Sequence, residues 1–133
     1  KPDPTDTLAG KLILVPNKKN YKNGETVELT VHGFGMKAVN ALSFALAYSP
    51  NDYEYIGLEA KEIGTLENYT NDRLHSNGKK SIYPTFVNIG DKPTLNGSKD
   101  LFILKFKAHK NGPCTLQMTD GLLVDKNLQY LLF

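Results

Sequence analysis

The sequence predicts an all-β sandwich. Short runs rich in β-branched and aromatic residues recur along the chain, separated by clusters of glycine, proline, asparagine and aspartate. Within several of these runs apolar and polar residues alternate, as they do in strands with one buried and one wet face. No stretch shows the longer period of a convincing long helix.

The first half of the chain predicts four strands. Pro16 ends the first strand, and the Asn23-Gly24 turn leads into the second. In the third, leucine, phenylalanine and tyrosine alternate with alanine and serine. The four predicted strands span residues 11–15, 26–33, 39–48 and 53–60.

The second half is less regular. Residues 62–70 are compatible with either one helical turn or a loop, and residues 90–99 predict a long polar loop. Pro84 falls inside a predicted strand, where proline is tolerated only at an edge or a bulge. The predicted strands here span residues 71–76, 79–89, 100–109, 114–119, 122–124 and 129–133.

Length and composition predict one folded domain, residues 11–133, after an extended linker over residues 1–10. Hydrophobic residues make up 40% of the chain and charged residues 23%. The net charge is only +2 and is spread along the sequence, which argues against nucleic-acid binding. No run approaches the roughly 18 apolar residues of a membrane span. Because Lys1 stands where a methionine would begin a complete chain, we expect a larger parent protein.

Catalytic, metal or cofactor sites are not indicated. The three histidines, His32, His75 and His109, lie too far apart in sequence for a zinc motif. Cys114 is the only cysteine, and the strand pattern around it offers no element that would activate a thiolate. The loop aspartates lack the spacing of a calcium-binding loop, and no carboxylate pair stands out for glycoside hydrolysis. We therefore expect a non-enzymatic protein.

The third predicted strand has an unusual outward face, because all its residues are small and uncharged. A solvated sheet face normally carries lysine, glutamate, threonine or glutamine. Short side chains let a partner approach closely and cost little to remove from water. A docking surface is one explanation, and cover by a loop or a neighbouring domain is the other. The residues concerned are Ala41, Ser43, Ala45 and Ala47.

This strand also resembles a known family. The run from Leu42 to Pro50, followed by the apolar run from Tyr53 to Glu59, is similar to the pattern of bacterial cohesin domains. The segments 23–31, 78–86 and 100–108 resemble further cohesin strands in the same order. No single motif is diagnostic, so the order and spacing of the segments carry the resemblance.

The resemblance implies a nine-stranded flattened β-sandwich with jelly-roll topology and no catalytic residues. Cohesins bind a dockerin module through one sheet face, and the dockerin carries its own calcium, so no cofactor is expected. We expect a secreted or cell-surface domain that is monomeric alone and helps to assemble carbohydrate-degrading enzymes. Alternation predicts the partner-binding residues Ser43, Ala45, Ala47, Tyr83, Thr85, Val87, Ile103 and Lys105, with Tyr83 as the aromatic anchor.

The chain departs from the cohesin pattern in three places. Ser43 and Ala45 stand where cohesins of cellulosomes commonly place asparagine and aspartate. Ser49 replaces the usual aspartate before Pro50, and residues 128–133 lack the usual glycine-rich ending. These departures suggest a divergent cohesin from a multimodular enzyme.

Two other functions fit the sequence. A carbohydrate-binding module would share the fold class, and Tyr53 with Tyr55 could form its aromatic platform, although the chain has no tryptophan. A structural spacer that positions a catalytic neighbour would also fit, because fold alone does not determine function.

Overall fold

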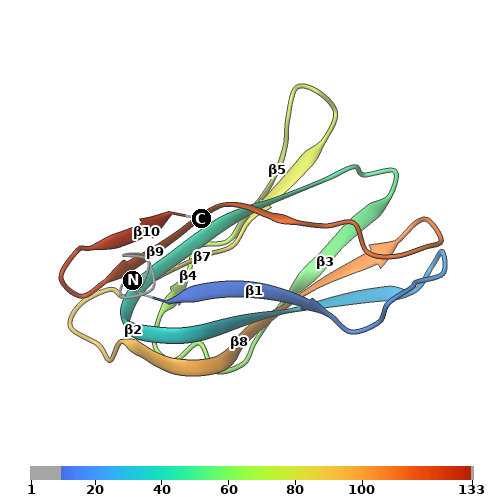
Figure 1. Ribbon diagram of the computed structural model, residues 1–133. Coiled ribbons are helices and arrows are strands. Elements are labelled where there is room, and N and C mark those ends of the chain that lie inside the picture. The colour runs from blue at the N-terminus through green and yellow to red at the C-terminus, as the bar shows by residue number, and fades with distance from the viewer. Residues whose placement is uncertain (1–9, 133) are drawn as a thin grey trace, which may run out of the picture.

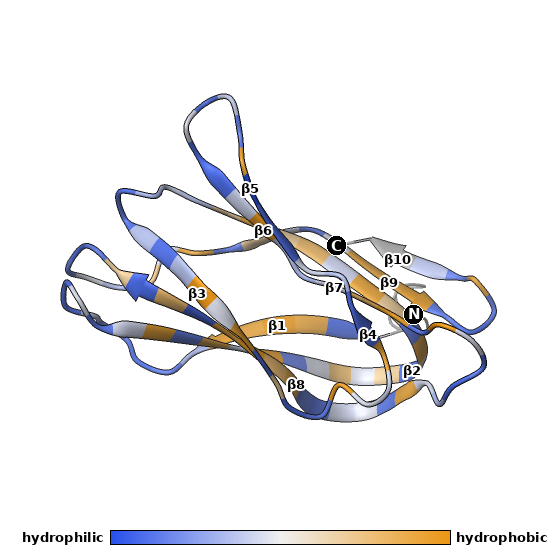
Figure 2. Cartoon of the chain, turned by 180° about the vertical axis from the view of Figure 1, so that it is seen from behind, coloured by the Kyte–Doolittle hydropathy of each residue, from blue (hydrophilic) through white to orange (hydrophobic). Residues whose placement is uncertain are grey.

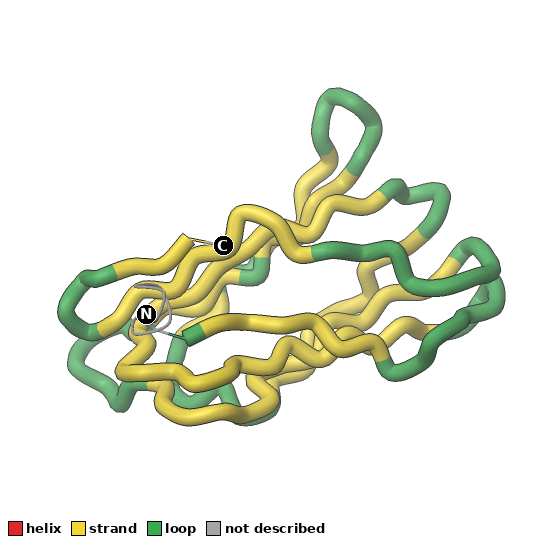
Figure 3. The backbone as a smooth tube through the Cα atoms, viewed as in Figure 1, coloured by secondary structure: helices red, strands yellow, loops and turns green. Residues whose placement is uncertain are grey.

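A computed structural model describes residues 10–132 of the chain. The predicted linker, apart from Gly10, lies outside the described residues. Every regular element in the described part is a strand, as Figure 3 shows. The strands pair in antiparallel fashion. The ten strands are β1 (Lys11–Pro16), β2 (Thr26–Tyr48), β3 (Tyr53–Ala60), β4 (Glu67–Asn68), β5 (Asn71–Leu74), β6 (Lys80–Tyr83), β7 (Thr85–Val87), β8 (Leu95–Ala108), β9 (Met118–Asp125) and β10 (Tyr130–Leu132).

The strands form two packed layers (Figure 1). In one layer the first half of β2 lies between β1 and β8, and β3 pairs with the far side of β8. We call this layer the β8 sheet. In the other, the second half of β2 lies between β9 and the strands β6 and β7, with β10, β5 and β4 outside them. We call this layer the β9 sheet.

Strand β2 passes from one layer to the other through a corner between Gly33 and Val39, where its register with β8 shifts twice. Two residues of the corner, Gly35 and Ala38, have positive φ angles of 60° and 52°. The amide of Ala38 donates to Asn96 Oδ1 at 2.8 Å. A bulged, strongly twisted strand with side-chain support is the usual way to turn such a corner.

The core is filled by the inward residues of both layers. Phe102 of β8 lies against Phe44 of β2 and Phe86 of β7, with ring centroids 6.4 and 4.8 Å apart. Tyr48 meets Phe106 edge-on at 5.2 Å. Since these rings come from opposite sheets, their contacts hold the two layers together.

The all-β sandwich is confirmed, and the strand predicted over residues 53–60 has the observed bounds. The predicted second and third strands are one continuous β2, and Pro84 divides another predicted strand into β6 and β7. Residues 62–70 contain the short β4 and no helical turn.

Two boundaries were predicted wrongly. The predicted loop at residues 90–99 contains the start of β8, where the buried Leu95 pairs with Val39 at the corner. Residues 114–117 are irregular, and β9 begins only at Met118.

Truncating Phe102 tests the contact between the layers. This side chain is fully buried, so Phe102→Ala is expected to lower the free energy of unfolding by about 3 to 5 kcal/mol. Its neighbour Ile103 points outward and is partly exposed, so Ile103→Ala should cost less than about 1 kcal/mol. Urea unfolding of both variants checks this, and equal losses would contradict the assigned orientation of β8.

The corner of β2 provides a second test. An alanine with positive φ is strained, and a β-branched residue is strained more. Ala38→Val is therefore expected to destabilise the domain by about 1 to 2 kcal/mol. Ala38→Gly should leave its stability unchanged or raise it by up to about 1 kcal/mol. Thermal unfolding should give melting temperatures in the order glycine, alanine, valine, and a higher value for valine than for alanine would be inconsistent with the corner geometry.

Candidate partner-binding face

The second half of β2 separates a buried side from an outward side. Leu42, Phe44 and Leu46 are at most 2% exposed and point into the core. On the other side Ala47 is exposed, and Ala41 and Ser43 are half-exposed. Ala45 also lies on this side but is only 8% exposed. The described residues therefore leave most of this row of short side chains open to solvent.

Strands β6 and β7 add a second row. The register pairs Ala41 with Val87, Ser43 with Thr85, and Ala47 with Ser81. The same register places Tyr83 beside Ala45. Directly paired residues of antiparallel strands share a face, so these side chains lie next to the β2 row. Six of the predicted residues thus come together: Ser43, Ala45, Ala47, Tyr83, Thr85 and Val87.

Strand β9 adds a third row, which the sequence analysis missed. Ala41 pairs with Val124, Ser43 with Leu122, and Ala45 with Thr119. The alternation in β9 gave a signal, because Leu123 is buried while its neighbours Leu122 and Val124 are half-exposed. What the sequence did not reveal is the pairing with β2. We call the three rows together the small-residue face: Ala41, Ser43, Ala45, Ala47, Tyr83, Thr85, Val87, Thr119, Leu122 and Val124.

Tyr83 is the aromatic side chain among these three rows, and His75 holds its hydroxyl. The His75 Nε2 atom lies 2.8 Å from the Tyr83 hydroxyl, and the two rings meet edge-on at 6.1 Å. His75 follows β5 in the hairpin that joins β5 to β6, which projects from the body in Figure 1. The orientation of Tyr83 is therefore set by the hairpin.

The hairpin is fixed to the body by a second contact. The Tyr48 hydroxyl donates to both carboxylate oxygens of Asp72, at 2.8 and 3.0 Å. Lys80 pairs with the same carboxylate at 2.6 Å. Burial, followed by the bond to Asp72, raises the pKa of Tyr48, so the hydroxyl keeps its proton and remains a donor.

Charged side chains lie at the edges of the small-residue face. Glu67 pairs with Val87 at one edge, and Arg73 pairs with Ser81 at another. The three rows themselves are apolar or hydroxyl-bearing. A partner could thus cover the centre without stripping water from a charge, and the rim could supply polar contacts.

The prediction placed Ile103 and Lys105 on this face, and that placement is wrong. Both lie on the outer side of the β8 sheet, where Ile103 pairs with Thr30 and Lys105 with Glu28. Lys105 also forms an ion pair with Glu59 at 2.7 Å. Alternation shows which residues of a strand point outward, but it does not show to which sheet the strand belongs.

Tyr53 and Tyr55, which could have formed the aromatic platform of a carbohydrate-binding module, do not form one. Tyr53 is 3% exposed and Tyr55 is half-buried. Both meet the Phe106 ring edge-on, with centroids 6.3 and 5.4 Å apart. They are core residues and present no flat surface on which a sugar could stack.

The residues considered for chemistry do not assemble into a reactive site. Burial raises the pKa of the Cys114 thiol, which disfavours the nucleophilic thiolate. The His109 Nε2 atom lies 3.5 Å from Oε1 of Glu54. Within residues 10–132, no group of three histidine, cysteine, aspartate or glutamate side chains is placed to hold a metal. In the same range no helix is long and apolar enough to cross a membrane.

Comparison with solved structures shows which proteins share this architecture. The cohesin module of a family 33 glycoside hydrolase from Clostridium perfringens matches with a TM-score of 0.68 over 96% of this chain and 91% of that one, at 12% identity. The chain has the cohesin fold. The second type II cohesin of the scaffoldin ScaA from Acetivibrio cellulolyticus matches with a TM-score of 0.69 at 11% identity, over 92% of this chain and 83% of that one.

A further match with the cohesin fold was solved with its partner. The sixth cohesin of scaffoldin B from Acetivibrio cellulolyticus, in complex with a Cel5 dockerin, matches with a TM-score of 0.63 at 15% identity, over 90% of this chain and 89% of that one. No protein-family model matches the chain, and no curated protein matches it significantly. At these identities the similarity establishes the fold, and function has to be argued from the site.

The ion pairs on the β8 sheet predict a dependence on pH. Bonds from Lys105 and then Lys61 lower the pKa of Glu59 to about 2 from its ordinary value of 4.5. A lowered folded-state pKa stabilises the protein above pH 4.5, and this contribution disappears as the pH falls through about 2. The melting temperature of Glu59→Gln should thus lie below that of wild type at neutral pH and approach it near pH 2.

The matched control for this prediction is Glu62→Gln, an exposed carboxylate without an ion pair to any described residue. It should behave as wild type at every pH. Because the Glu59 pairs are exposed, the difference should be small and should shrink in about 1 M salt. A difference that persists unchanged at low pH would show that the pairs are not its cause.

Proposed function

We propose that this domain is a non-catalytic module that binds a dockerin-type protein through the small-residue face. The observation that supports this most directly is the open row of Ala41, Ser43 and Ala47 beside Tyr83. A flat surface of short side chains next to a fixed aromatic is well suited to a protein partner, because interface energy concentrates in such aromatic anchors.

The comparisons support the same proposal. Two of the structural matches are cohesins solved in complex with dockerins, one from Acetivibrio cellulolyticus and one from Clostridium thermocellum. The calcium in such a complex would belong to the dockerin, so this domain would need no cofactor. The proposed role is the assembly of extracellular carbohydrate-degrading enzymes, from a secreted or cell-surface parent protein.

The composition of the face bears on specificity. Ser43 and Ala45 offer one hydroxyl where asparagine and aspartate would offer several hydrogen-bonding atoms and a charge. We therefore expect a partner whose contact surface is mainly apolar opposite these two positions. A dockerin that depends on a carboxylate there should bind poorly, because its own polar groups would be left unpaired.

The test is calorimetric titration of the domain with the dockerin-type modules of its source organism, with and without calcium. Ser43→Arg places a long charged side chain in the centre of the face and should weaken binding at least about 30-fold, the factor for about 2 kcal/mol. Tyr83→Ala should weaken it to a similar extent. The matched control is Thr30→Arg, also outward and half-exposed on β2 but in the β8 sheet.

Each outcome of this titration has a defined meaning. Calcium-dependent binding that Ser43→Arg removes and Thr30→Arg preserves would support the proposal. Binding that only Thr30→Arg removes would place the partner on the β8 sheet. If no dockerin-type module binds, the spacer function would become the better account.

A further inference from the structure

Strand β1 has the composition of an interior strand but the position of an edge strand. Within the described residues it pairs with β2 alone. Leu12 is buried and Leu14 is half-buried on its inner side, while Ile13 and Val15 are 41% and 47% exposed on its outer side. Figure 2 shows the strand as hydrophobic along most of its length. Edge strands are normally protected by charges or bulges, whereas apolar residues on both faces are typical of strands that are covered.

The backbone of this edge is available for pairing. The backbone N–H of Asn17 donates a hydrogen bond to the carbonyl oxygen of Glu28 at 3.0 Å, which continues the register that pairs β1 with β2. Because the direction of backbone groups alternates along a strand, the N–H and C=O groups of Leu12 and Leu14 point away from β2. No hydrogen bond from these four groups to another described residue is formed. They form a template for one more strand.

A groove runs along this edge. One hollow of about 330 Å³ is lined by Leu12, Ile13 and Leu14 on one wall and by Leu116, Gln117 and Met118 on the other. A second hollow of about 430 Å³ continues along the same two chain segments. It is lined by Pro16, Asn17, Lys18, Lys19, Pro113 and Cys114. The second wall consists of the irregular segment before β9 together with Met118, the first residue of β9. Among the described residues, no strand pairs with either wall on the groove side.

The two ends of the groove differ chemically. The β1 end is apolar apart from Gln117, and the other end carries two lysines with no acidic side chain in its lining. Lys18 is paired with Glu25 at 2.6 Å. Lys19 is exposed and forms no ion pair with a described residue. The groove would thus complement an extended segment that is apolar along its length and acidic at one end.

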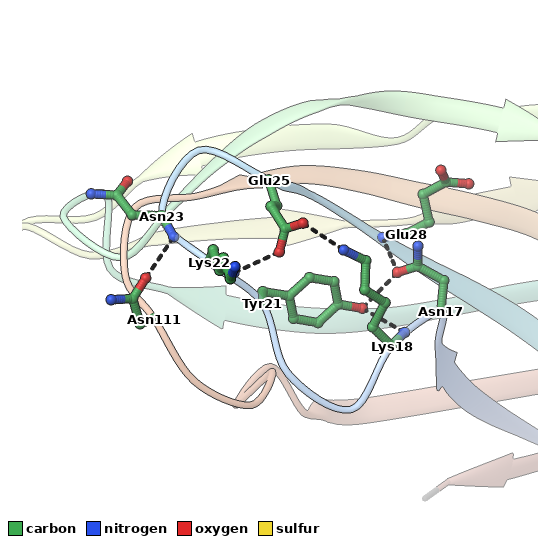
Figure 4. A network of polar contacts seen from close by, with 8 residues as sticks. All are labelled: Asn17, Lys18, Tyr21, Lys22, Asn23, Glu25, Glu28 and Asn111. Carbon is green, nitrogen blue, oxygen red and sulfur yellow. Dashed lines mark hydrogen bonds and ion pairs between the residues drawn. The ribbon is translucent and has the colours of Figure 1, made fainter.

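The loop that carries the two lysines is ordered by its own hydrogen bonds (Figure 4). The Tyr21 hydroxyl donates to Asn17 Oδ1 at 2.6 Å and accepts from the Lys18 amide at 3.1 Å. Asn111 Oδ1 accepts from the Asn23 amide at 2.8 Å and ties the loop to the chain before β9. Because this end of the groove is already ordered, less conformational entropy is lost when a segment binds there.

We propose that this groove binds an extended segment of a partner protein by strand addition to β1, with an acidic end beside Lys19. The site lies outside the small-residue face and does not depend on dockerin binding. Alternating side chains of the added segment would cover Leu14, Leu116 and Met118 on the inside, and Ile13 and Val15 on the outside.

The probe is a short synthetic peptide that alternates valine and threonine and ends in two aspartates. It is titrated into the full ¹⁵N-labelled chain and followed by NMR. Binding should shift the amides of residues 12–14 and 116–118 and slow hydrogen exchange of Leu12 and Leu14 about tenfold or more. It should also slow alkylation of Cys114, the single thiol, which lines the groove. A control peptide of the same length and with the same two aspartates, but with proline at alternate positions, should produce none of these effects.

Charge-reversal variants test whether the peptide binds in the groove or elsewhere on the surface. Lys19→Glu should weaken peptide binding roughly tenfold, while Lys126→Glu, an equal charge change in the exposed turn after β9, should not. Shifts confined to other strands, or equal weakening by both variants, would overturn the proposal. So would a concentration-dependent dimer whose interface protects Leu12 and Leu14, since the occupant would then be a second copy of the chain.

Discussion

The passage of β2 through both sheets is the constraint on which the rest of the structure depends. Its first half is bonded to β1 and β8, and its second half to β9, β6 and β7, so one strand lies at the centre of each layer. The corner between Gly33 and Val39 turns one half over the other, and this brings Phe44 above Phe102. The same turn directs Ser43 and Ala47 outward on the opposite side of the β9 sheet. Core and candidate site therefore share a single backbone path.

The two outer faces of the sandwich differ in where their charged side chains lie. The outer side of the β8 sheet carries charged residues that form ion pairs with one another, such as Glu59 with Lys61 and Lys105. A partner there would have to disrupt those pairs. The small-residue face holds its charges at the edges, and its aromatic residue, Tyr83, is fixed by His75. The contrast favours the β9 sheet as the partner-binding side.

Local signals allowed much of this to be predicted from the sequence. The alternation from Leu42 to Tyr48 predicted which side chains are buried, and the turns and prolines located most strand ends. Information about pairing between distant segments was missing. Leu95 stands alone among polar residues, so nothing local showed that it pairs with Val39 and begins β8. For the same reason Ile103 was assigned to the wrong sheet, and Leu122 and Val124 were left out of the candidate site. Tyr53 and Tyr55 share a strand side, but the sequence did not show that this side faces Phe106.

The alternation of inward and outward residues in the second half of β2 has an evolutionary consequence. Leu42, Phe44 and Leu46 maintain the core, whereas Ser43 and Ala47 contribute little to it. Mutations can therefore accumulate at the outward positions and create new recognition specificities while selection for folding acts on the inward ones. Because the two sets of positions can change independently, the outward surface can change while the protein stays folded.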